Sequence, residues 1–145
     1  MIVIVDIDGT LSDSRHREHH LQGEKPDWDA FFNGCHADPV VVPVLRSVHA
    51  LWMAGNQLVL VTGRPERLRS VTTIWLDDNG VPHQKLLMRG DDDHRPSHVY
   101  KRDAVIRHVT TALHPAEAVL AIDNSEADCA MYRELGIPTM QFALA

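Results

Sequence analysis

The chain has 145 residues, of which 44% are hydrophobic and 23% charged, as is usual for a globular protein that buries one core. Its formal net charge of -6, without any run of five or six like charges, argues against broad binding to duplex DNA or to a membrane surface. No stretch is long and apolar enough to span a bilayer and no cationic leader precedes the first apolar run, so we expect one cytoplasmic domain over residues 1–145. In a reducing compartment Cys35 and Cys129 would remain thiols.

Short apolar runs alternate with segments of helical periodicity, which predicts a mostly parallel sheet covered by helices on both faces. The expected strands cover residues 2–6, 58–61, 85–88, 118–122 and 139–142. The expected helices begin at Pro43, at Pro65, near Val99 and near Ser125, and end near Gly55, Gly80, Leu113 and Gly136. The fold class is therefore α/β, a three-layer α/β/α sandwich of Rossmann type with a parallel sheet of about five strands. Right-handed crossovers would place the first strand between the second and the fourth.

Residues 12–42 interrupt this alternation, and we interpret them as a small cap-like insert after the first strand. Within the insert, Trp28, Phe31 and Phe32 fall at helical spacing. The favoured interpretation is that this stripe packs the insert onto the body of the protein. The alternative is that one of the rings stacks on a base of the substrate.

Two further clusters have a simpler interpretation than a metal site. His16 and His20 are spaced like a pair of zinc ligands, but no second pair lies nearby. We therefore expect exposed histidines on the insert, where His16 or Arg17 could touch a phosphodiester. The acidic run 91–93 could bind a cation, yet a solvated loop is the favoured interpretation.

Polar residues of chemical interest follow three of the expected strands: Asp6 and Asp8 after the first, Thr62 after the second, and Asp123 with Asn124 after the fourth. In an open parallel sheet, ligands bind beyond the carboxyl ends of the strands, where the strand order reverses. We therefore expect these residues to line one crevice.

Asp6 and Asp8 lie two residues apart, so on an extended chain their carboxylates crowd together and need a cation or a shared proton. Magnesium usually takes one or two carboxylates together with phosphate and water, and Asp6 and Asp123 are its natural ligands here. Asp6 would then attack phosphorus and form an aspartyl-phosphate. Asp8 would act as the general acid and base.

Two features indicate phosphate binding. Thr62, Gly63 and Arg64 supply a hydroxyl and backbone N–H groups at the expected start of a helix, which favours a phosphate oxygen. Lys101 stands near the start of another helix, where the helix dipole does not favour a cation, so its expected role is to neutralise the transferring phosphate. The alternatives are a simple helix cap and a solvated lysine.

Four segments together carry a family resemblance: Asp6-Ile7-Asp8-Gly9-Thr10, Val61-Thr62-Gly63-Arg64, Lys101 and Asp123-Asn124. In order and spacing they resemble the four motifs of the haloacid dehalogenase-like (HAD) hydrolases. Within that superfamily the chain most resembles the 3'-phosphatase domain of phage-type polynucleotide kinase/phosphatases, from residue 1 to about residue 142.

The resemblance implies a magnesium-dependent phosphatase in which Asp6 is the nucleophile and Asp8 the acid and base. It implies phosphate binding by Thr62, Gly63 and Lys101 and contact with the substrate by Arg64 and Arg17. The implied magnesium ligands are Asp6, the backbone carbonyl of Asp8, Asp123 and, indirectly, Asn124.

Two positions depart from the pattern of that family. Asn124 stands where a second acidic residue is expected, and Ser97 stands where an aspartate, four residues before Lys101, would steady the lysine. These departures leave the identity of the substrate open. The sequence also contains no G-x-x-x-x-G-K-[ST] loop of a kinase half.

The leading hypothesis is removal of a terminal 3' phosphate from a polynucleotide or nucleotide, because the short insert is the only expected cover over the site. One alternative is a small-molecule phosphatase that acts on nucleoside monophosphates or sugar phosphates. Another is a non-enzymatic module that accepts a phosphate on Asp6 and signals to a partner, although Asp8 argues against it. The expected partner is a phosphorylated nucleic acid end or nucleotide and not a membrane, and the sequence does not decide whether a separate kinase acts with it.

Overall fold

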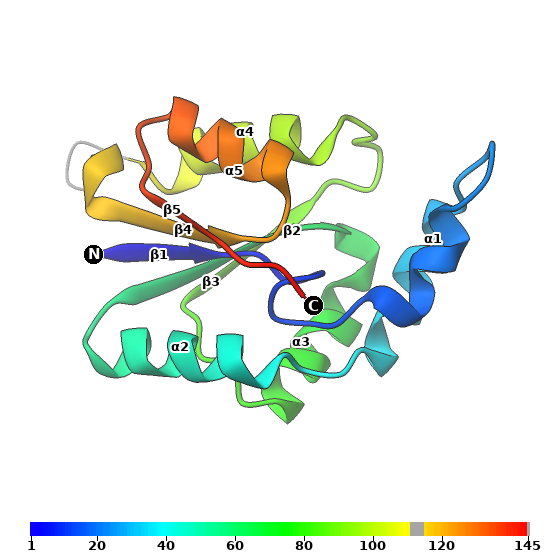
Figure 1. The fold of residues 1–145 in the computed structure, drawn as a ribbon, viewed down its shortest axis with the longest axis horizontal. Coiled ribbons are helices and arrows are strands. Elements are labelled where there is room, and N and C mark those ends of the chain that lie inside the picture. The colour runs from blue at the N-terminus through cyan, green and yellow to red at the C-terminus, as the bar shows by residue number, and fades with distance from the viewer. Residues whose placement is uncertain (111–114, 145) are drawn as a thin grey trace.

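The computed structural model describes residues 1–110 and 115–144. They build a parallel sheet of five strands in the order β3-β2-β1-β4-β5 (Figure 1). The strands are β1 (Ile2–Val5), β2 (Gln57–Pro65), β3 (Lys85–Arg89), β4 (Val119–Asp123) and β5 (Thr139–Gln141). The first strand lies between β2 and β4, as predicted, with Ile4 opposite Val59 and Ala121.

Helices cover both faces of the sheet, which confirms the three-layer α/β/α sandwich (Figure 1). One layer holds α2 (Val42–Met53) and α3 (Arg69–Asp78), and the opposite layer holds α4 (Ser97–His108) and α5 (Glu126–Glu134). Short 3-10 helices precede α3 (η3, Glu66–Leu68) and β4 (η4, Ala116–Ala118). The predicted end of α4 at Leu113 lies outside the described residues. Within the two described ranges, no helix has the length and apolar character that crossing a membrane requires.

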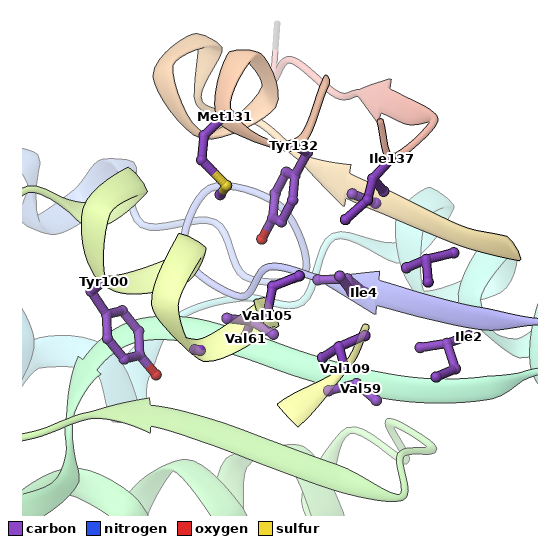
Figure 2. Close-up of a cluster of buried hydrophobic side chains, with 13 residues drawn as sticks. Ile2, Ile4, Val59, Val61, Tyr100, Val105, Val109, Met131, Tyr132 and Ile137 are labelled. Carbon is purple, nitrogen blue, oxygen red and sulfur yellow. The ribbon is translucent and has the colours of Figure 1, made fainter. Parts of the chain in front are cut away.

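The central strand β1 is apolar on both faces because each face lies under a helical layer. Ile2 and Ile4 pack with side chains of α4 and α5 in one cluster (Figure 2). Val3 and Val5 point to the opposite face and join a second cluster. None of these four residues is more than 6% exposed. The strand that leads into Asp6 is therefore fixed from both sides.

The insert lies beyond the carboxyl end of β1 (Figure 1), and its last part packs beside α3, where the indole N–H of Trp75 donates to the carbonyl of Asp38 at 2.8 Å. It contains the 3-10 helix η1 (Arg15–Leu21), the helix α1 (Trp28–Asn33) and the 3-10 helix η2 (Gly34–Ala37). Its two ends lie side by side, because Ser12 pairs with Val40 in an antiparallel bridge and the N–H of Val41 donates to the carbonyl of Leu11 at 2.8 Å. The insert therefore leaves and re-enters the body of the protein at one place.

The prediction that a helix begins at Pro65 is wrong. The strand β2 continues through Pro65, and α3 begins only at Arg69, after η3. The physical reason is a shift of register against β3 between Thr62 and Pro65, which makes Gly63 and Arg64 extra residues on β2. Such a bulge bends the strand and re-aims its side chains without ending the pairing.

Candidate active site

Two aspartates lie at the carboxyl ends of neighbouring central strands. Asp6 follows β1 and Asp123 ends β4, and the backbone N–H of Asp6 donates to the carbonyl of Ile122 at 3.0 Å. Lys101 reaches between them from α4, and its ammonium donates to Asp6 at 2.8 Å and to Asp123 at 2.7 Å. The carboxylate of Asp128 on α5 accepts from the same ammonium at 2.7 Å. Residues from two strands and two helices therefore meet at one buried lysine.

This cluster carries more negative than positive charge. Burial, together with the nearby Asp123 carboxylate, raises the pKa of Asp6 to about 8 against the attraction of Lys101. Burial also raises the pKa of Asp123. Burial alone would lower the pKa of Lys101, but Asp6 and Asp123 outweigh this effect and raise that pKa well above its usual value. The lysine therefore stays charged, and the carboxylates around it lack a second cation.

The donor set of the cluster fits a divalent cation. Oxygens of Asp6 and Asp123 approach the same ammonium, and hard oxygen donors of this kind are those that magnesium prefers. Oδ1 of Asp128 is buried and has no hydrogen-bond partner in the described part of the chain. Because buried carboxylate oxygens are normally satisfied, this oxygen indicates a place for a water or a cation.

Asn124 lies beside the turn that follows β1. The Thr10 hydroxyl is 3.0 Å from Oδ2 of Asp6 and 3.3 Å from Oδ1 of Asn124. Gly9 has a φ of 85°, and a Cβ on this residue would fall 2.4 Å from Nδ2 of Asn124. Glycine accommodates both the left-handed backbone and the close approach. The amide oxygen of Asn124 is thereby held next to Asp6, through the hydroxyl that both contact.

Asp8 is held by two arginines from different elements. Arg64 of β2 donates to Asp8 from Nη2 at 2.6 Å and from Nε at 3.0 Å, and Arg17 of η1 donates from Nη2 at 2.5 Å. Both guanidinium groups also donate to Asp38, which follows η2. Burial would raise the pKa of Asp8, but Arg64 and Arg17 outweigh it and lower that pKa to about 2. Asp8 is therefore ionised at neutral pH.

The structure places Arg17 and Arg64 differently from the expected contact with substrate. Their side chains are 2% and 0% exposed. Their donors are taken by Asp8 and Asp38, and Nη1 of Arg17 also donates to the carbonyl of Phe31 at 3.0 Å. The physical reason is that Asp8 and Asp38 bind both guanidinium groups in the interior. Asp38 carries no motif signal, so sequence reasoning missed it.

Gly63 lies on the bulge of β2 and Thr62 directly before it, and neither is at the start of a helix, so no helix dipole assists phosphate binding there. Thr62 is fully buried, and its hydroxyl oxygen accepts from the backbone N–H of Arg64 at 3.2 Å. Gly63 has the guanidinium of Arg89 beside it, because Nη2 of Arg89 is 3.2 Å from the position that a Cβ of Gly63 would take. The absence of a side chain at Gly63 therefore gives this cation its space.

Sequence reasoning missed Arg89, the last residue of β3. Among the described residues Arg89 has no carboxylate partner: Nη1 donates to the carbonyl of Arg95 at 2.7 Å, and Nε is buried without a partner. Its guanidinium lies over the ring of Tyr100, 5.5 Å from the centroid. Arg89 is thus a cation available to an anionic ligand. The pairing of β3 with β2 brings it to Gly63, and no local spacing could have signalled that.

The role of Asp128 was also missed. The spacing of Ser125 and Asp128 predicts a capping box, and the Ser125 hydroxyl does accept from the backbone N–H of Asp128 at 3.3 Å. The carboxylate of Asp128, however, turns to Lys101 and accepts a further hydrogen bond from Oγ of Ser97 at 3.0 Å. Asp128 therefore steadies the lysine in place of the aspartate that the family resemblance leads one to expect at position 97.

A cleft of about 1170 Å³ opens over Asp6, Asp8 and Lys101. Of the other predicted site residues, Gly63 and Asn124 line the cleft. The remaining four are buried behind this lining: Arg17, Thr62, Arg64 and Asp123. Pockets for small ligands usually measure roughly 300 to 1,000 Å³. The cleft is therefore wide enough for a substrate much larger than inorganic phosphate.

The aromatic residues of the insert differ in how far they are buried. Phe31 is 7% exposed, but its ring contacts are with Trp28, Phe32 and Arg17, all within the insert, and Trp28 is 54% exposed. All three rings, including that of Phe32, contribute to the wall of the cleft. The prediction that the stripe packs the insert onto the body is therefore not confirmed, because Phe31 packs within the insert and Trp28 is exposed in the wall of the cleft.

The histidines of the insert do not gather into a ligand set. Nε2 of His16 lies 2.7 Å from Oδ1 of Asp38, and the rings of His19 and His20 lie 4.0 Å apart. In residues 1–110 and 115–144, no group of three or more histidine, cysteine or acidic side chains is arranged to hold a metal by itself. Both cysteines are free and buried.

An aspartate pair after the first strand of a parallel sheet in this order is the arrangement of the HAD phosphatases, and solved structures of that class share the fold. CbbY from Rhodobacter sphaeroides in complex with phosphate has a TM-score of 0.67 at 14% identity, with 99% of this chain and 86% of that chain covered. The D,D-heptose 1.7-bisphosphate phosphatase from B. bronchiseptica, complexed with magnesium and phosphate, has a TM-score of 0.61 at 18% identity, with 97% and 79% covered. The chain therefore has the fold of this class.

The family within this class follows from the sequence. The sequence model of the polynucleotide kinase PNKP phosphatase domain matches residues 1–145, and the chain belongs to that family. A chain in the structure of the Pnkp1/Rnl/Hen1 complex is 25% identical, with a TM-score of 0.79 over 99% of this chain. The present chain spans 46% of that protein, about half its length. No curated protein matches the sequence.

Proposed function

We propose that the chain hydrolyses phosphomonoesters with magnesium, through an aspartyl-phosphate on Asp6, and that its substrate is a polynucleotide or nucleotide with a terminal 3' phosphate. The observation that carries this proposal is the buried cluster in which Lys101 joins Asp6, Asp123 and Asp128. Such a cluster combines a nucleophile with a cation for the phosphate that it attacks. Membership of a phosphatase family favours an enzyme over a module that only accepts phosphate.

The magnesium ion would be held by Asp6, the backbone carbonyl of Asp8 and Asp123, with Asn124 supporting it indirectly. The raised pKa of Asp6 supports this site, since a cation can take the place of the proton that the crowded carboxylates need. When bound, the ion would neutralise the phosphate and orient it. The heptose bisphosphate phosphatase of the same fold was solved with magnesium and phosphate.

The reaction would take place in two displacements. An oxygen of Asp6 attacks phosphorus while the bond from phosphorus to the leaving oxygen breaks, and Asp8 gives that oxygen a proton. Water then attacks the aspartyl-phosphate, Asp8 takes a proton from it, and the bond between phosphorus and Asp6 breaks to release phosphate. The hydroxyl of Thr62, the backbone of Gly63 and the ammonium of Lys101 would bind the phosphoryl oxygens in both steps.

The buried arginines would act on Asp8 and not on the substrate. Arg17 and Arg64 orient the carboxylate of Asp8 and keep it ionised, which suits its role as the base of the second step. For the first step Asp8 must carry a proton, and the charge of a phosphate dianion beside it would raise its pKa toward that state. Arg89, which has no carboxylate partner among the described residues, would bind a further anionic group of the substrate.

The size and openness of the cleft favour a nucleic acid end over a sugar phosphate. Among the described residues the insert, between β1 and α2, is the only long segment that could cover the cleft. The described loops after β2 and β3 are short. The similar chains belong to the Pnkp1/Rnl/Hen1 RNA repair complex, and by that likeness the present chain would act with partner proteins on RNA. A kinase, where one is needed, would be one of these partners.

A comparison of substrates tests the proposed specificity. We would measure phosphate release from a 3'-phosphorylated oligonucleotide, the same oligonucleotide phosphorylated at its 5' end, a 3'-mononucleotide and a sugar phosphate. We expect the highest kcat/KM for the 3'-phosphorylated oligonucleotide. Equal or faster turnover of mononucleotides or sugar phosphates would favour the small-molecule phosphatase instead.

The variants Asp6→Asn and Asp8→Asn test the proposed mechanism. Asp6→Asn keeps the shape of the side chain but removes the nucleophilic oxygen, so we expect turnover below detection. Asp8→Asn should slow hydrolysis of the intermediate, and mass spectrometry should then detect the phosphorylated protein. Near-normal activity of Asp6→Asn with magnesium would contradict covalent catalysis. A stable phosphoenzyme of the unaltered chain, with no phosphate released, would favour the phospho-acceptor module.

A further inference from the structure

Trp28 leaves 54% of its surface exposed in the wall of the cleft that contains Asp6. Its ring stacks on Phe32, with centroids 5.8 Å apart and planes inclined by 29°, and meets the edge of Phe31 at 5.8 Å and 84°. The three rings therefore form one block on α1, with the indole on the outside. Tryptophan is highly buried in most proteins, so this exposure over a substrate cleft points to a ligand.

The aromatic block is connected to the catalytic Asp8 through Arg17. Phe31, at its base, lies under the guanidinium of Arg17, whose Cζ is 4.2 Å from the ring centroid. Nη1 of Arg17 donates to the carbonyl of Phe31 at 3.0 Å, and Nη2 donates to Asp8 at 2.5 Å. One buried side chain thus fixes the distance from the block to Asp8.

Both ends of α1 are held to the body of the protein. Arg67, on the 3-10 helix that follows β2, donates to Asn33, the last residue of α1, at 2.8 Å and to Asp29, the second, at 2.9 Å. The contact with Asp29 lies next to Trp28 in the sequence and partly neutralises this carboxylate at the cleft. The indole therefore stands on a supported helix and not on a free loop.

We propose that Trp28, backed by Phe32, is a stacking platform for a nucleobase of the strand whose phosphorylated end lies at Asp6. A flat aromatic face binds any base by stacking, which suits an enzyme that acts on ends of varied sequence. Lys25 lines the same cleft, is exposed and has no ion-pair partner among the described residues, so it is available to a phosphodiester of that strand. The inference rests on the proposed phosphatase function and narrows its substrate to strands that carry bases near the phosphate.

The test compares two 3'-phosphorylated oligonucleotides of equal length, one with all its bases and one with abasic residues at its last three positions. For the unaltered chain we expect a lower KM with the base-bearing strand, by about 10- to 100-fold, since that is the range for one stacked base. Trp28→Ala should raise KM for the base-bearing strand to the abasic value and leave kcat and the abasic reaction unchanged. Trp28→Phe should keep most of the difference.

The outcomes separate this inference from the proposed function. If the unaltered chain hydrolyses both strands with the same KM, or if Trp28→Ala slows both reactions alike, the platform is refuted while the phosphatase stands. If the unaltered chain releases phosphate from neither strand, both proposals are overturned. Trp52→Ala is the matched control, because it removes an indole from α2, outside the cleft, and should leave the preference for bases intact.

A binding measurement that needs no turnover completes the test. In the Asp6→Asn background, the base-bearing strand should quench tryptophan fluorescence more strongly than the abasic strand does. Adding Trp28→Phe to that background should remove the difference, because Trp52 and Trp75 lie outside the cleft. Equal quenching by both strands would contradict stacking on Trp28.

Discussion

Lys101 shows how far a single side chain at this site depends on partners from elsewhere in the chain. Its three carboxylate partners come from the end of β1, the end of β4 and the helix α5. Ser97, one turn earlier on α4, holds the third of these, Asp128, by a hydrogen bond. The pair formed by Ser97 and Asp128 therefore serves the purpose that a single aspartate on α4 would serve.

A carboxylate moved from position 128 to position 97 should take over part of the support that Asp128 gives to Lys101. Asp128→Ala should lower kcat about 10- to 100-fold, the usual effect of removing a group that orients a catalytic side chain. Adding Ser97→Asp, which places a carboxylate one helical turn before Lys101, should recover part of the loss in steady-state assays. Asp128→Asn is the control and should lose less, because it still accepts from the lysine. Failure of Ser97→Asp to improve the Asp128→Ala variant would contradict this account.

Asp8 should make a pH-dependent contribution to stability. Its pKa is about 2 in the folded protein against an ordinary value of 3.8, so the folded state favours the ionised form. A depressed carboxyl pKa stabilises the protein above the unfolded value, and that stability is lost as the pH falls through the folded value. From the size of the shift we expect about 2 kcal/mol.

Urea unfolding of the unaltered chain and of Asp8→Asn, from about pH 6 to about pH 2, measures this contribution. The difference in unfolding free energy between the two proteins should be constant above about pH 5 and should shrink toward about pH 2. A difference that does not depend on pH would mean that the arginines do not favour the ionised form of Asp8.

At the scale of elements, the insert is bound to the sheet through buried charge and not through an apolar face alone. Arg17 of η1 bonds Asp8 on the body, Asp38 at the end of the insert and the carbonyl of Phe31 on α1. A guanidinium can reach several acceptors in one plane, which an ammonium cannot. Arg17 therefore organises the insert from its interior.

Arg17→Met should lower the unfolding free energy by about 3 kcal/mol, because it leaves two buried carboxylates with Arg64 as their remaining buried partner. Arg17→Lys should restore little of this, since it cannot reach all of the acceptors. Chemical unfolding measures both. Arg15→Met, on the same 3-10 helix, removes the exposed pair with Asp13 and should leave the unfolding free energy almost unchanged. An equally small effect of Arg17→Met would contradict the role given to this residue.

The elements show where sequence patterns sufficed and where they did not. Helix α2 begins next to Pro43, and β1 and β4 take their predicted places, because local propensity and burial agree there. The extension of β2 through Pro65 was not predictable from the motif, because the bulge at Gly63 and Arg64 arises from pairing with β3. Proline is a good first residue of a helix, and here tertiary pairing overrode that preference.

At the scale of the whole molecule, the sheet brings distant motifs to one edge. The strand order predicted from right-handed crossovers was sufficient to place Asp6 beside Asp123. The roles of Asp128 and Asp38 could not be predicted, because each depends on how a helix or loop packs over that edge, and the role of Arg89 depends on the pairing of β3 with β2. The residues at the strand ends could thus be predicted from the sequence, whereas the residues that support them could not.

Magnesium should stabilise the molecule and enable its activity together. A chelator should abolish phosphate release, and magnesium at 100 times its dissociation constant should raise the unfolding free energy by about 2.7 kcal/mol. Asp123→Asn should lose both effects, because it removes a proposed ligand. Thermal unfolding with and without the ion provides the measurement, with calcium as a comparison. Full activity in a chelator would rule out the metal-dependent mechanism.

The antiparallel bridge between Ser12 and Val40 makes the insert a unit that can be changed independently of the sheet. The ends of the intervening segment are already joined, and the entropy of closing a loop changes only slowly with its length. A longer or different segment between these anchors would leave the sheet and its phosphoryl chemistry in place, provided that Arg17 and Asp38 are retained. Substrate choice could therefore be redesigned by grafting a new loop at one entry point, without disturbing the catalytic edge.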